Sequence, residues 1–363
     1  MPSFRPIIRD AYTEILRREA DAGGLEHYNR LMNQGSSEAD LREALLRSDE
    51  YAQKNPLFPL APRVGLNVHI PSNAILNDVA RNLGVGWIRV DFDWYRIEPS
   101  RGVFQWQDTD RVVDRATELG LEILATLSYT PAWASSNPSN PRIGDPPASV
   151  AYWTDIVRAT VERYRDRVVF WQPWNEPNIH EFWNGSMQRY RSEILQPGAS
   201  LMRQLVPGGS VVAPGLANVG NWRDWFDEAM QSKSLIDIIN HHNYPQNGRD
   251  AIVELRSDQL FRPSLRTKMR DHGVDDRPFW LTETGRKTSD SNQRQQPWYD
   301  DCLRTLQQEL WVNKLFFFHY WDGPGQGNGG FGIVNENFSP KPVYRTLQAA
   351  LNTEAFVASV MAT

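Results

Sequence analysis

The chain has 363 residues and a formal net charge of −5, with acidic and basic residues mixed along its length. A chain of this size can bury a large core in about two domains, and no lysine- and arginine-rich run marks a nucleic-acid or anionic-membrane surface. Cys302 is the only cysteine, which excludes a disulfide framework and a thiolate metal cluster. The longest strongly apolar run is about seven residues, near Leu315 to Trp321, which is too short for a membrane-spanning helix.

Residues 1–54 differ in pattern from the rest of the chain and predict a small helical domain. Apolar residues recur at helical spacing from Ile7 to Leu16 and again from Leu41 to Tyr51. Between these stretches, the residues from Asp21 to Gly24 are expected to stop a helix. The prediction is a bundle of three short helices, followed by a stiff linker over the proline-rich residues 55–62.

From residue 63 to residue 363, strand-like apolar runs alternate with helix-like segments. The candidate strands are Val64–Val68, Trp87–Phe92, Glu122–Leu127, Val168–Trp174, Val211–Pro214, Ile236–His241, Phe279–Thr282 and Leu315–Tyr320. The 254 residues from Asn67 to Trp321 make seven intervals of about 36 residues, the repeat expected of an α/β fold of the (β/α)8 TIM-barrel type.

An open, doubly wound sheet is the alternative architecture. No glycine-rich dinucleotide turn follows the first strand, which favours the barrel. Gly325–Gly330 formally matches such a turn, but no helix start follows it, so a mobile loop over a cleft is predicted there instead.

Two of the predicted strands end beside a lone glutamate. Phe170–Pro177 carries Glu176, and Phe279–Gly285 carries Glu283, which lies 107 residues or three barrel repeats later. A proline and a glycine then break the strands, so both carboxylates are expected at the C-terminal mouth of the barrel, where barrel enzymes place their chemistry. Two carboxyl groups about 5 to 5.5 Å apart can cleave a glycosidic bond by double displacement, one as acid/base and the other as nucleophile.

Three motifs resemble clan A glycoside hydrolases, and family 39 in particular. Trp174-Asn175-Glu176-Pro177-Asn178 resembles the acid/base signature, and Thr282-Glu283-Thr284-Gly285 resembles the nucleophile strand. Gly332–Asn337 and Pro340–Leu347 resemble the closing strand-to-helix segment, so the resemblance spans most of residues 64–350. It implies a retaining β-glycosidase that needs no cofactor and no metal.

The resemblance also implies a role for each matching residue. Glu176 would be the general acid/base and Glu283 the nucleophile, with Asn175 holding a sugar hydroxyl beside the reacting carbon. Arg89 and Tyr244 match the residues that hydrogen-bond the nucleophile. Such an arginine would keep the nucleophile ionised at neutral pH.

Further aromatic and histidine residues follow the predicted strands. The remaining candidate substrate-binding residues are Trp321, which matches an aromatic platform in the resemblance, His69, Trp133, His242 and Trp183. A metal site of His69, His241 and His242 is another use of the histidines. Adjacent strand residues point to opposite faces, however, so at most one of the two neighbouring histidines can face the lumen.

The first domain carries a resemblance of its own. Residues 11–28 and 48–51 resemble a bacterial helical domain of unknown function that is similar to the phycobilisome linker fold. That domain is often attached to exported or cell-surface proteins, so docking to a protein or cell-surface partner, surface attachment and carbohydrate contact are all open. No apolar secretion core is visible near Met1, so the compartment is left unassigned, with an extracellular or cell-surface location favoured.

The sequence therefore predicts a helical module followed by a retaining glycoside hydrolase barrel that acts on a polysaccharide or an oligosaccharide. The spread of aromatic residues favours endo attack on a bacterial exopolysaccharide. A non-catalytic carbohydrate-binding or scaffold barrel, a transglycosidase and a metal-dependent hydrolase remain open as alternatives.

Overall fold

The computed structural model describes residues 3–16, 18–46, 48, 50, 60–245, 248–259, 262–288, 292–323 and 330–361. The chain divides into two compact units, Met1–Phe58 and Pro59–Thr363. Most of the predicted linker, residues 55–62, and most of the predicted glycine-rich loop, Gly325–Gly330, lie outside the described residues. None of the helices in the described part of the chain is long and apolar enough to cross a membrane.

The first unit contains the three short helices that the sequence predicts. They are α1 (Arg5–Ala11), which continues into a π-helical turn over Tyr12–Leu16, α2 (Ala22–Asn33) and α3 (Glu38–Leu46). Its core consists of apolar side chains from each helix, namely Ile8, Ala11, Tyr12, Leu16, Leu25, Met32, Leu41 and Leu45. This is the amphipathic pattern that predicted the bundle.

The expected helix stop at Asp21–Gly24 is wrong. Asp21 is the N-cap of α2, with its carboxylate accepting the backbone N–H of Gly24 at 2.8 Å, and both glycines lie in the first helical turn. A Cβ atom at Gly24 would lie 2.3 Å from the hydroxyl of Tyr12. Glycine is therefore used here for a close approach between helices and not to end one.

The second unit is built on nine parallel strands in its described residues. These are β1 (Val64–His69), β2 (Trp87–Asp93), β3 (Glu122–Ser128), β4 (Phe170–Pro173), β5 (Ser210–Val211), β6 (Leu216–Ala217), β7 (Ile239–His242), β8 (Phe279–Thr284) and β9 (Val312–Phe317). Their order in the sheet is β5-β4-β3-β2-β1-β9-β8-β7-β6, so strands that follow one another in the chain are neighbours in space.

The segment that carries β5 and β6 fills a single position of the barrel. Its first part pairs with β4 and its second part pairs with β7. Between them, Val212 bridges to Ile238, and Gly215 bridges to Asn175 just beyond β4. The sheet thereby curls round on itself, as a (β/α)8 barrel requires.

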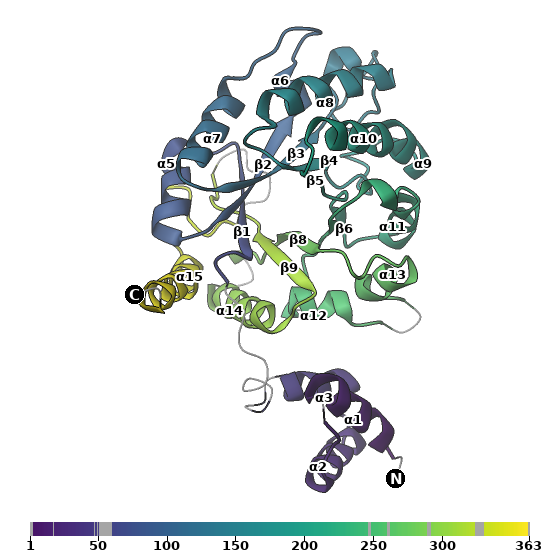
Figure 1. The fold of residues 1–363 in the computed structure, drawn as a ribbon, viewed down its shortest axis with the longest axis vertical. Helices are drawn as coiled ribbons and strands as arrows, with labels where there is room; N and C mark the ends of the chain where they lie inside the picture. The colour runs from purple at the N-terminus through teal and green to yellow at the C-terminus, as the bar shows by residue number, and fades with distance from the viewer. Residues whose placement is uncertain are drawn as a thin grey trace. The chain divides into compact units, whose positions relative to one another are not determined.

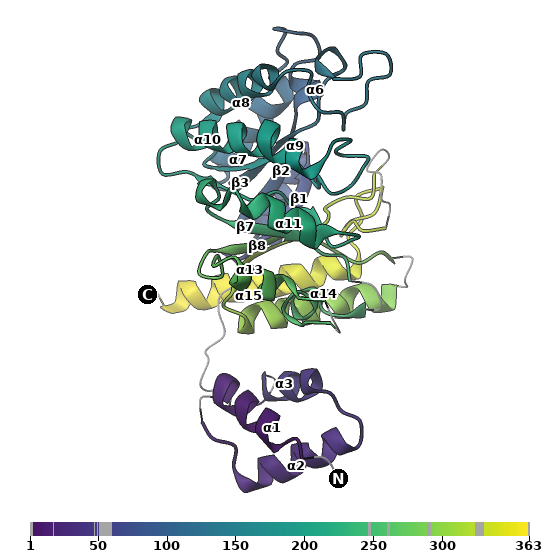
Figure 2. The same cartoon turned by 90° about the vertical axis from the view of Figure 1, so that its right-hand side faces the viewer.

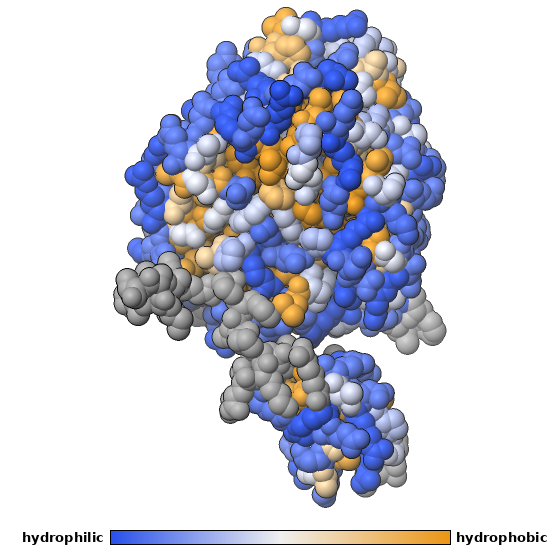
Figure 3. Space-filling view, in the orientation of Figure 1, coloured by the Kyte–Doolittle hydropathy of each residue, from blue (hydrophilic) through white to orange (hydrophobic). Residues whose placement is uncertain are grey.

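Helices cover the outside of these strands (Figures 1 and 2). They are α5 (Asn73–Asn77), α6 (Trp94–Ile97), α7 (Gln107–Glu118), α8 (Val150–Tyr164), α9 (Met187–Tyr190), α10 (Gln196–Leu205), α11 (Trp222–Met230), α12 (Ala251–Arg256), α13 (Leu265–Asp271), α14 (Asn292–Gln308) and α15 (Pro342–Met361). Hydrophilic residues occupy most of the periphery of this unit in Figure 3, while hydrophobic residues are visible near the middle of the face. The predicted fold class is confirmed, although several predicted strands are shifted by a few residues.

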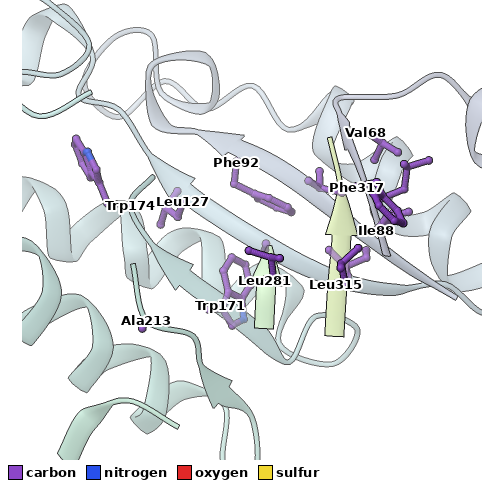
Figure 4. Packing of buried hydrophobic residues seen from close by; sticks show 14 of the residues in the cluster. Val68, Ile88, Phe92, Leu127, Trp171, Trp174, Ala213, Leu281, Leu315 and Phe317 are labelled. Carbon is purple, nitrogen blue, oxygen red and sulfur yellow. The ribbon is translucent and has the colours of Figure 1, made fainter. Parts of the chain in front are cut away.

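Two apolar clusters lie on opposite sides of the strands, one outside the barrel and one in its lumen. The larger one fills the space between the strands and the helices, and Figure 4 shows some of its members, among them Phe92, Leu127 and Trp171 on the adjacent strands β2, β3 and β4. The smaller one contains Trp87, Leu124, Val212, Ile238, Trp280 and Phe316. These six alternate along their strands with members of the larger cluster, so they fill one end of the lumen.

Polar side chains form the next layer along the lumen. Strand alternation places residues two positions after the apolar layer on the same face. These residues are Arg89 on β2, Thr126 on β3, Asn240 on β7 and Thr282 on β8, and all four are buried. The lumen therefore changes from apolar to polar toward the carboxyl ends of the strands.

Candidate active site

Glu176 follows β4 on a short, unusual stretch of backbone. The strand ends at Pro173, three residues before the glutamate, and both Trp174 and Glu176 have positive φ angles, of 79° and 40°. The backbone N–H of Glu176 donates to the carbonyl of Gly215 at 3.1 Å, which ties this turn to the adjacent barrel position. The carboxylate is thus held by a strained turn beyond the strand end, and such strain is typical of functional sites.

Glu283 reaches the same place by a different route. It lies inside β8. The pairing of β8 with β9 shifts register between Leu281 and Thr284, and its pairing with β7 shifts register between His241 and His242. A bulge re-aims a side chain that regular alternation would send to the other face. The inward-facing Thr282 is therefore followed by a glutamate that also reaches the site.

The two glutamates meet around one histidine. An oxygen of Glu176, a ring nitrogen of His242 and an oxygen of Glu283 all lie within 4.8 Å of one another. Nδ1 of His242 is 2.9 Å from Oε1 of Glu176 and 3.5 Å from Oε1 of Glu283. One oxygen of each carboxylate therefore lies within 4.8 Å of the other, a proximity that is compatible with a retaining mechanism.

Arg89 and Tyr244 both donate hydrogen bonds to Glu283. Nη1 of Arg89 lies 2.6 Å from one carboxylate oxygen, and the hydroxyl of Tyr244 lies 2.7 Å from the other. The same guanidinium also donates to the side-chain oxygens of Asn67 and Asn175, at 2.9 and 2.8 Å. This fork links the nucleophile candidate to the residue before the acid/base candidate.

The surroundings of the two carboxyl groups differ in their effect on protonation. Burial raises the pKa of Glu176, and the charge of Glu283 raises it further, against the opposing effects of His242 and Arg89. Burial alone would also raise the pKa of Glu283, but a protonated His242, Arg89 and the hydroxyl of Tyr244 bring it below its ordinary value. One group is thus suited to hold a proton and the other to stay ionised, which is the division of roles that a glycosidase needs.

His69 and Trp321 lie on one side of this pair and line a common cavity. The cavity has a volume of about 300 Å³ and is also lined by Asn67, His319 and Phe338. Nδ1 of His69 is 2.8 Å from Oδ2 of Asp91. The ring of Trp321 is stacked on Phe338 with the centroids 4.8 Å apart, and it lies four residues beyond the end of β9, not on the strand.

Trp183 does not line the cleft, so the prediction of a sugar subsite there is corrected. Only 2% of its surface is exposed, and its ring packs against Trp174 and Tyr190. Its indole N–H donates to the carbonyl of Ser186 at 3.1 Å. An aromatic residue near a strand end is as well suited to the core as to a sugar ring, because burial of a large ring stabilises the fold in either place.

Trp133 is half-buried, with its ring against Trp94 and Tyr152. Its indole N–H donates to the carbonyl of Glu98 at 2.8 Å. Its role in substrate binding stays a prediction.

The histidines do not converge as the alternative metal site requires. His241 points away from His242 and packs against Trp222, with ring centroids 4.7 Å apart. In the described residues, the donor atoms that do converge are those of Glu176, His242 and Glu283. The Arg89 guanidinium bonded to Glu283 already supplies positive charge there, so this set fits proton exchange better than a divalent cation.

Tyr129, just beyond the third predicted strand, has a φ of 72° and accepts a hydrogen bond from Asn175 at 2.9 Å. Other residues of the site were not singled out by the sequence patterns. Among them, Asn67 accepts a hydrogen bond from Arg89. Thr282 and Asn240 lie beneath His242. A polar residue at an inward position of an otherwise apolar strand was the available signal, and it applies to Asn67, Asn240 and Thr282.

Comparisons with known proteins agree with this geometry. The sequence model described as Glycosyl hydrolases family 39 matches residues 75–362. A beta-xylosidase from Caldicellulosiruptor saccharolyticus is 25% identical over 297 residues, which are 72% of this chain and 60% of the relative. A beta-xylosidase from Geobacillus stearothermophilus is 21% identical over 275 residues, which are 65% of this chain and 53% of the relative.

Solved structures show the same fold. A family 39 beta-xylosidase from Caulobacter crescentus superposes with a TM-score of 0.64 at 20% identity, over 82% of this chain and 72% of that one. A family 39 glycoside hydrolase from Bacteroides cellulosilyticus WH2 gives 0.63 at 18% identity, over 81% and 63%. The chain spans about 60% of the length of the first of the two beta-xylosidase relatives and about half of the second. Because the family match covers most of the sequence, the chain belongs to glycosyl hydrolases family 39.

Proposed function

We propose that this protein is a retaining glycoside hydrolase that cleaves β-glycosidic bonds by double displacement. The observation that carries the proposal is the convergence of Glu176 and Glu283 within 4.8 Å around His242, with one carboxyl pKa raised and the other lowered. Family membership supports the same reading. No cofactor enters the proposal.

In the first step, Glu176 protonates the leaving oxygen while Glu283 attacks the anomeric carbon. The C–O bond to the leaving group breaks as the bond to the carboxylate forms, giving a glycosyl ester on Glu283. Arg89 and Tyr244 hold the attacking carboxylate in place through both of its oxygens. Ordering the nucleophile in this way reduces the reorganisation needed to reach the transition state.

In the second step, Glu176 acts as a base toward water. Formation of the ester removes the negative charge of Glu283, which is one of the causes that raise the pKa of Glu176. The acid therefore becomes easier to ionise at the stage where a base is required. Water then attacks the anomeric carbon and releases the sugar with its original configuration.

For the substrate, we propose a β-linked polysaccharide or oligosaccharide, with endo attack on a bacterial exopolysaccharide as the finer version. Support comes from the cavity beside the carboxylates, which has room for a further sugar and is lined by Trp321 and Phe338. Phe338 is half exposed, and flat apolar rings suit the faces of sugars. The beta-xylosidase relatives make aryl β-xylosides the first small substrates to try.

The test is an NMR time course of hydrolysis with aryl β-xylosides and related β-glycosides. The first-formed sugar should have the β configuration, and an α product would contradict double displacement. With polysaccharides, early products of mixed lengths would support endo attack, whereas release of single sugar units would refute it.

The same experiment separates the other candidate functions. Binding without turnover would support a carbohydrate-binding barrel, and transfer to an added sugar in place of water would support a transglycosidase. Full activity after dialysis against a chelator is expected, because the proposed steps use only side chains.

For Met1–Phe58, we propose a docking role toward a protein or cell-surface partner. The support is its separate compact core, which contains no member of the carboxylate site. A pull-down with the full chain and with a chain that lacks Met1–Phe58 tests this proposal. The full chain should retain the partner, and the shortened chain should not.

A further inference from the structure

We infer that a chain of buried hydrogen bonds from Gln172 and Asn240 through Thr282 fixes the tautomer of His242 and thereby keeps the shared proton on Glu176. These three residues are positioning residues that act through His242. The inference rests on the proposed function for its kinetic consequence, but the tautomer itself is a property of the free protein.

Two backbone carbonyls set the orientation of the side-chain amides of Gln172 and Asn240, where this series of hydrogen bonds begins. Nε2 of Gln172 donates to the carbonyl of Trp174 at 2.8 Å, which leaves Oε1 of Gln172 facing Asn240. Nδ2 of Asn240 donates to that oxygen at 3.0 Å and to the carbonyl of Ala213 at 3.1 Å. Since a carbonyl can only accept, neither amide can be flipped without losing its bonds.

The orientation of Asn240 decides the direction of the next hydrogen bond. Its Oδ1 lies 2.6 Å from the hydroxyl of Thr282, and an amide oxygen can only accept. The single hydroxyl proton of Thr282 therefore points to Asn240. A lone pair of the same oxygen is left for the ring of His242, whose Nε2 lies 3.0 Å away.

Nε2 of His242 must consequently carry a hydrogen in order to donate to Thr282. In the neutral ring, this leaves Nδ1 without a hydrogen, as an acceptor. Oε1 of Glu176 lies 2.9 Å from Nδ1, and two acceptors can approach so closely only with a proton between them. The neutral imidazole thus selects the carboxylic acid form of Glu176, which is the form that can protonate a leaving group.

The charged groups around the pair come from two other strands, and a hydroxyl comes from just beyond β7 itself. Glu283 on β8 lies 3.5 Å from Nδ1, Arg89 on β2 is bonded to Glu283, and Tyr244 beyond β7 donates to the same carboxylate. His241 faces the other side of β7. With the His242 ring neutral, the donors Arg89 and Tyr244 still favour the ionised form of Glu283. Arg89 offsets the charge of Glu283, so the network of hydrogen bonds can decide where the proton lies. His242 and the three positioning residues are all buried, with exposed fractions of 1% or less, which shields them from water.

The direct test is 15N NMR of the histidine rings in the full-length protein without ligand. At neutral pH, the His242 signals, assigned by comparison with a His242→Gln variant, should show a protonated Nε2 and an unprotonated Nδ1. Two protonated nitrogens would place the proton on the imidazole, and an Nδ1–H tautomer would mean that the chain does not act as described. Either result overturns the inference, and neither needs a substrate.

The kinetic test is Thr282→Val, which removes the hydroxyl with little change in shape. His242 is then free to carry its hydrogen on Nδ1 and donate to Glu176, which stabilises the ionised carboxylate. The basic limb of the kcat/KM profile should move to lower pH by about one unit. The decrease in kcat/KM should be about ten-fold greater for substrates with poor leaving groups than for those with activated leaving groups. Thr282→Ser keeps the hydroxyl and should restore the profile.

Thr284→Val is the matched control on the same strand. Its hydroxyl donates to the carbonyl of Asn243 at 2.7 Å, so the variant also loses a buried hydroxyl but leaves the His242 chain intact. It should lower the thermal midpoint without moving the basic limb. An equal shift of the limb in both variants would refute the inference. If no β-glycoside is hydrolysed by the wild type, the proposed function fails while the NMR result still decides the tautomer.

Discussion

At the scale of single residues, Arg89 has the largest number of consequences. Its guanidinium contacts Glu283, Asn67 and Asn175 and is only 3% exposed. A buried arginine of this kind orients its partners and also compensates the charge of the carboxylate. Its removal should therefore affect stability and catalysis together.

Arg89→Met should destabilise the fold by about 3–5 kcal/mol, because a buried carboxylate loses its cation. Since Arg89 is one of the causes that lower the pKa of Glu283, the acidic limb of kcat/KM should also move to higher pH. Denaturant unfolding and a pH–rate profile measure the two effects. An unchanged acidic limb in a folded variant would show that Arg89 does not keep Glu283 ionised.

Glu176→Gln should separate stability from activity. The folded carboxyl has a raised pKa, so as pH rises above the ordinary value of 4.5 the unfolded chain loses this proton first and the wild type becomes less stable. The amide does not titrate, and its NH2 can donate to Nδ1 of His242 in place of the acid. The variant should lose about 10²–10⁴-fold in kcat for poor leaving groups. Its thermal midpoint should match or exceed that of the wild type, increasingly so toward high pH, and a uniformly lower midpoint would contradict this account.

The sequence was most informative about residues whose chemistry is rare in a strand. Glu176, Glu283, Arg89 and Tyr244 were predicted and lie together. Trp183 was misplaced because its type does not distinguish a core ring from a sugar platform. The roles of Gln172 and Asn240 depend on hydrogen-bond directions across the lumen, and no local pattern contains that information.

At the scale of elements, the barrel position shared by β5 and β6 has an unusual centre. A Cβ atom at Gly215 would lie 2.0 Å from Nε2 of His242, so the imidazole rests directly on backbone. The carbonyl of the same glycine accepts the N–H of Glu176. The sequence predicted one strand over Val211–Pro214, whereas the structure divides it around this contact.

Gly215→Ala should displace the His242 ring and lower kcat by about ten-fold or more, because acid catalysis depends on its position. Gly86→Ala is the control, since a Cβ atom there would be 3.5 Å from its nearest neighbour, the carbonyl of Ala61. That variant should keep wild-type kcat. Equal activities in the two variants, measured at saturating substrate, would mean that the close contact at Gly215 has no catalytic role.

Element boundaries were harder to predict than element types. The strand predicted over Ile236–His241 is observed as Ile239–His242, and the one predicted over Leu315–Tyr320 is observed as Val312–Phe317. Apolar runs continue past strand ends wherever the following turn is also buried. Pairing with neighbours, not local propensity, decides where such a strand begins and ends.

At the scale of the whole molecule, the site residues all belong to Pro59–Thr363. Deleting residues 1–58 should therefore leave kcat/KM for small aryl β-glycosides unchanged within about two-fold, because the contacts that hold the carboxylates remain. Steady-state kinetics of the two chains tests this. A substantial loss would assign Met1–Phe58 a part in the reaction.

The apolar layer at the far end of the lumen has a consequence for the chemistry. Trp87, Trp280 and Phe316 close that end, and the ammonium of Lys314 lies 3.8 Å from the centre of the Trp87 ring. In the described residues, this apolar layer fills the far end of the lumen, so substrate is expected to reach the carboxylates from the carboxyl ends of the strands. Sugar and water would then enter through the same open end of the lumen. An acceptor sugar bound in this opening should therefore delay hydrolysis of the proposed glycosyl ester on Glu283. Under the proposed mechanism, we therefore expect occupancy of this opening by an acceptor sugar to favour transfer over hydrolysis, with no change in either glutamate.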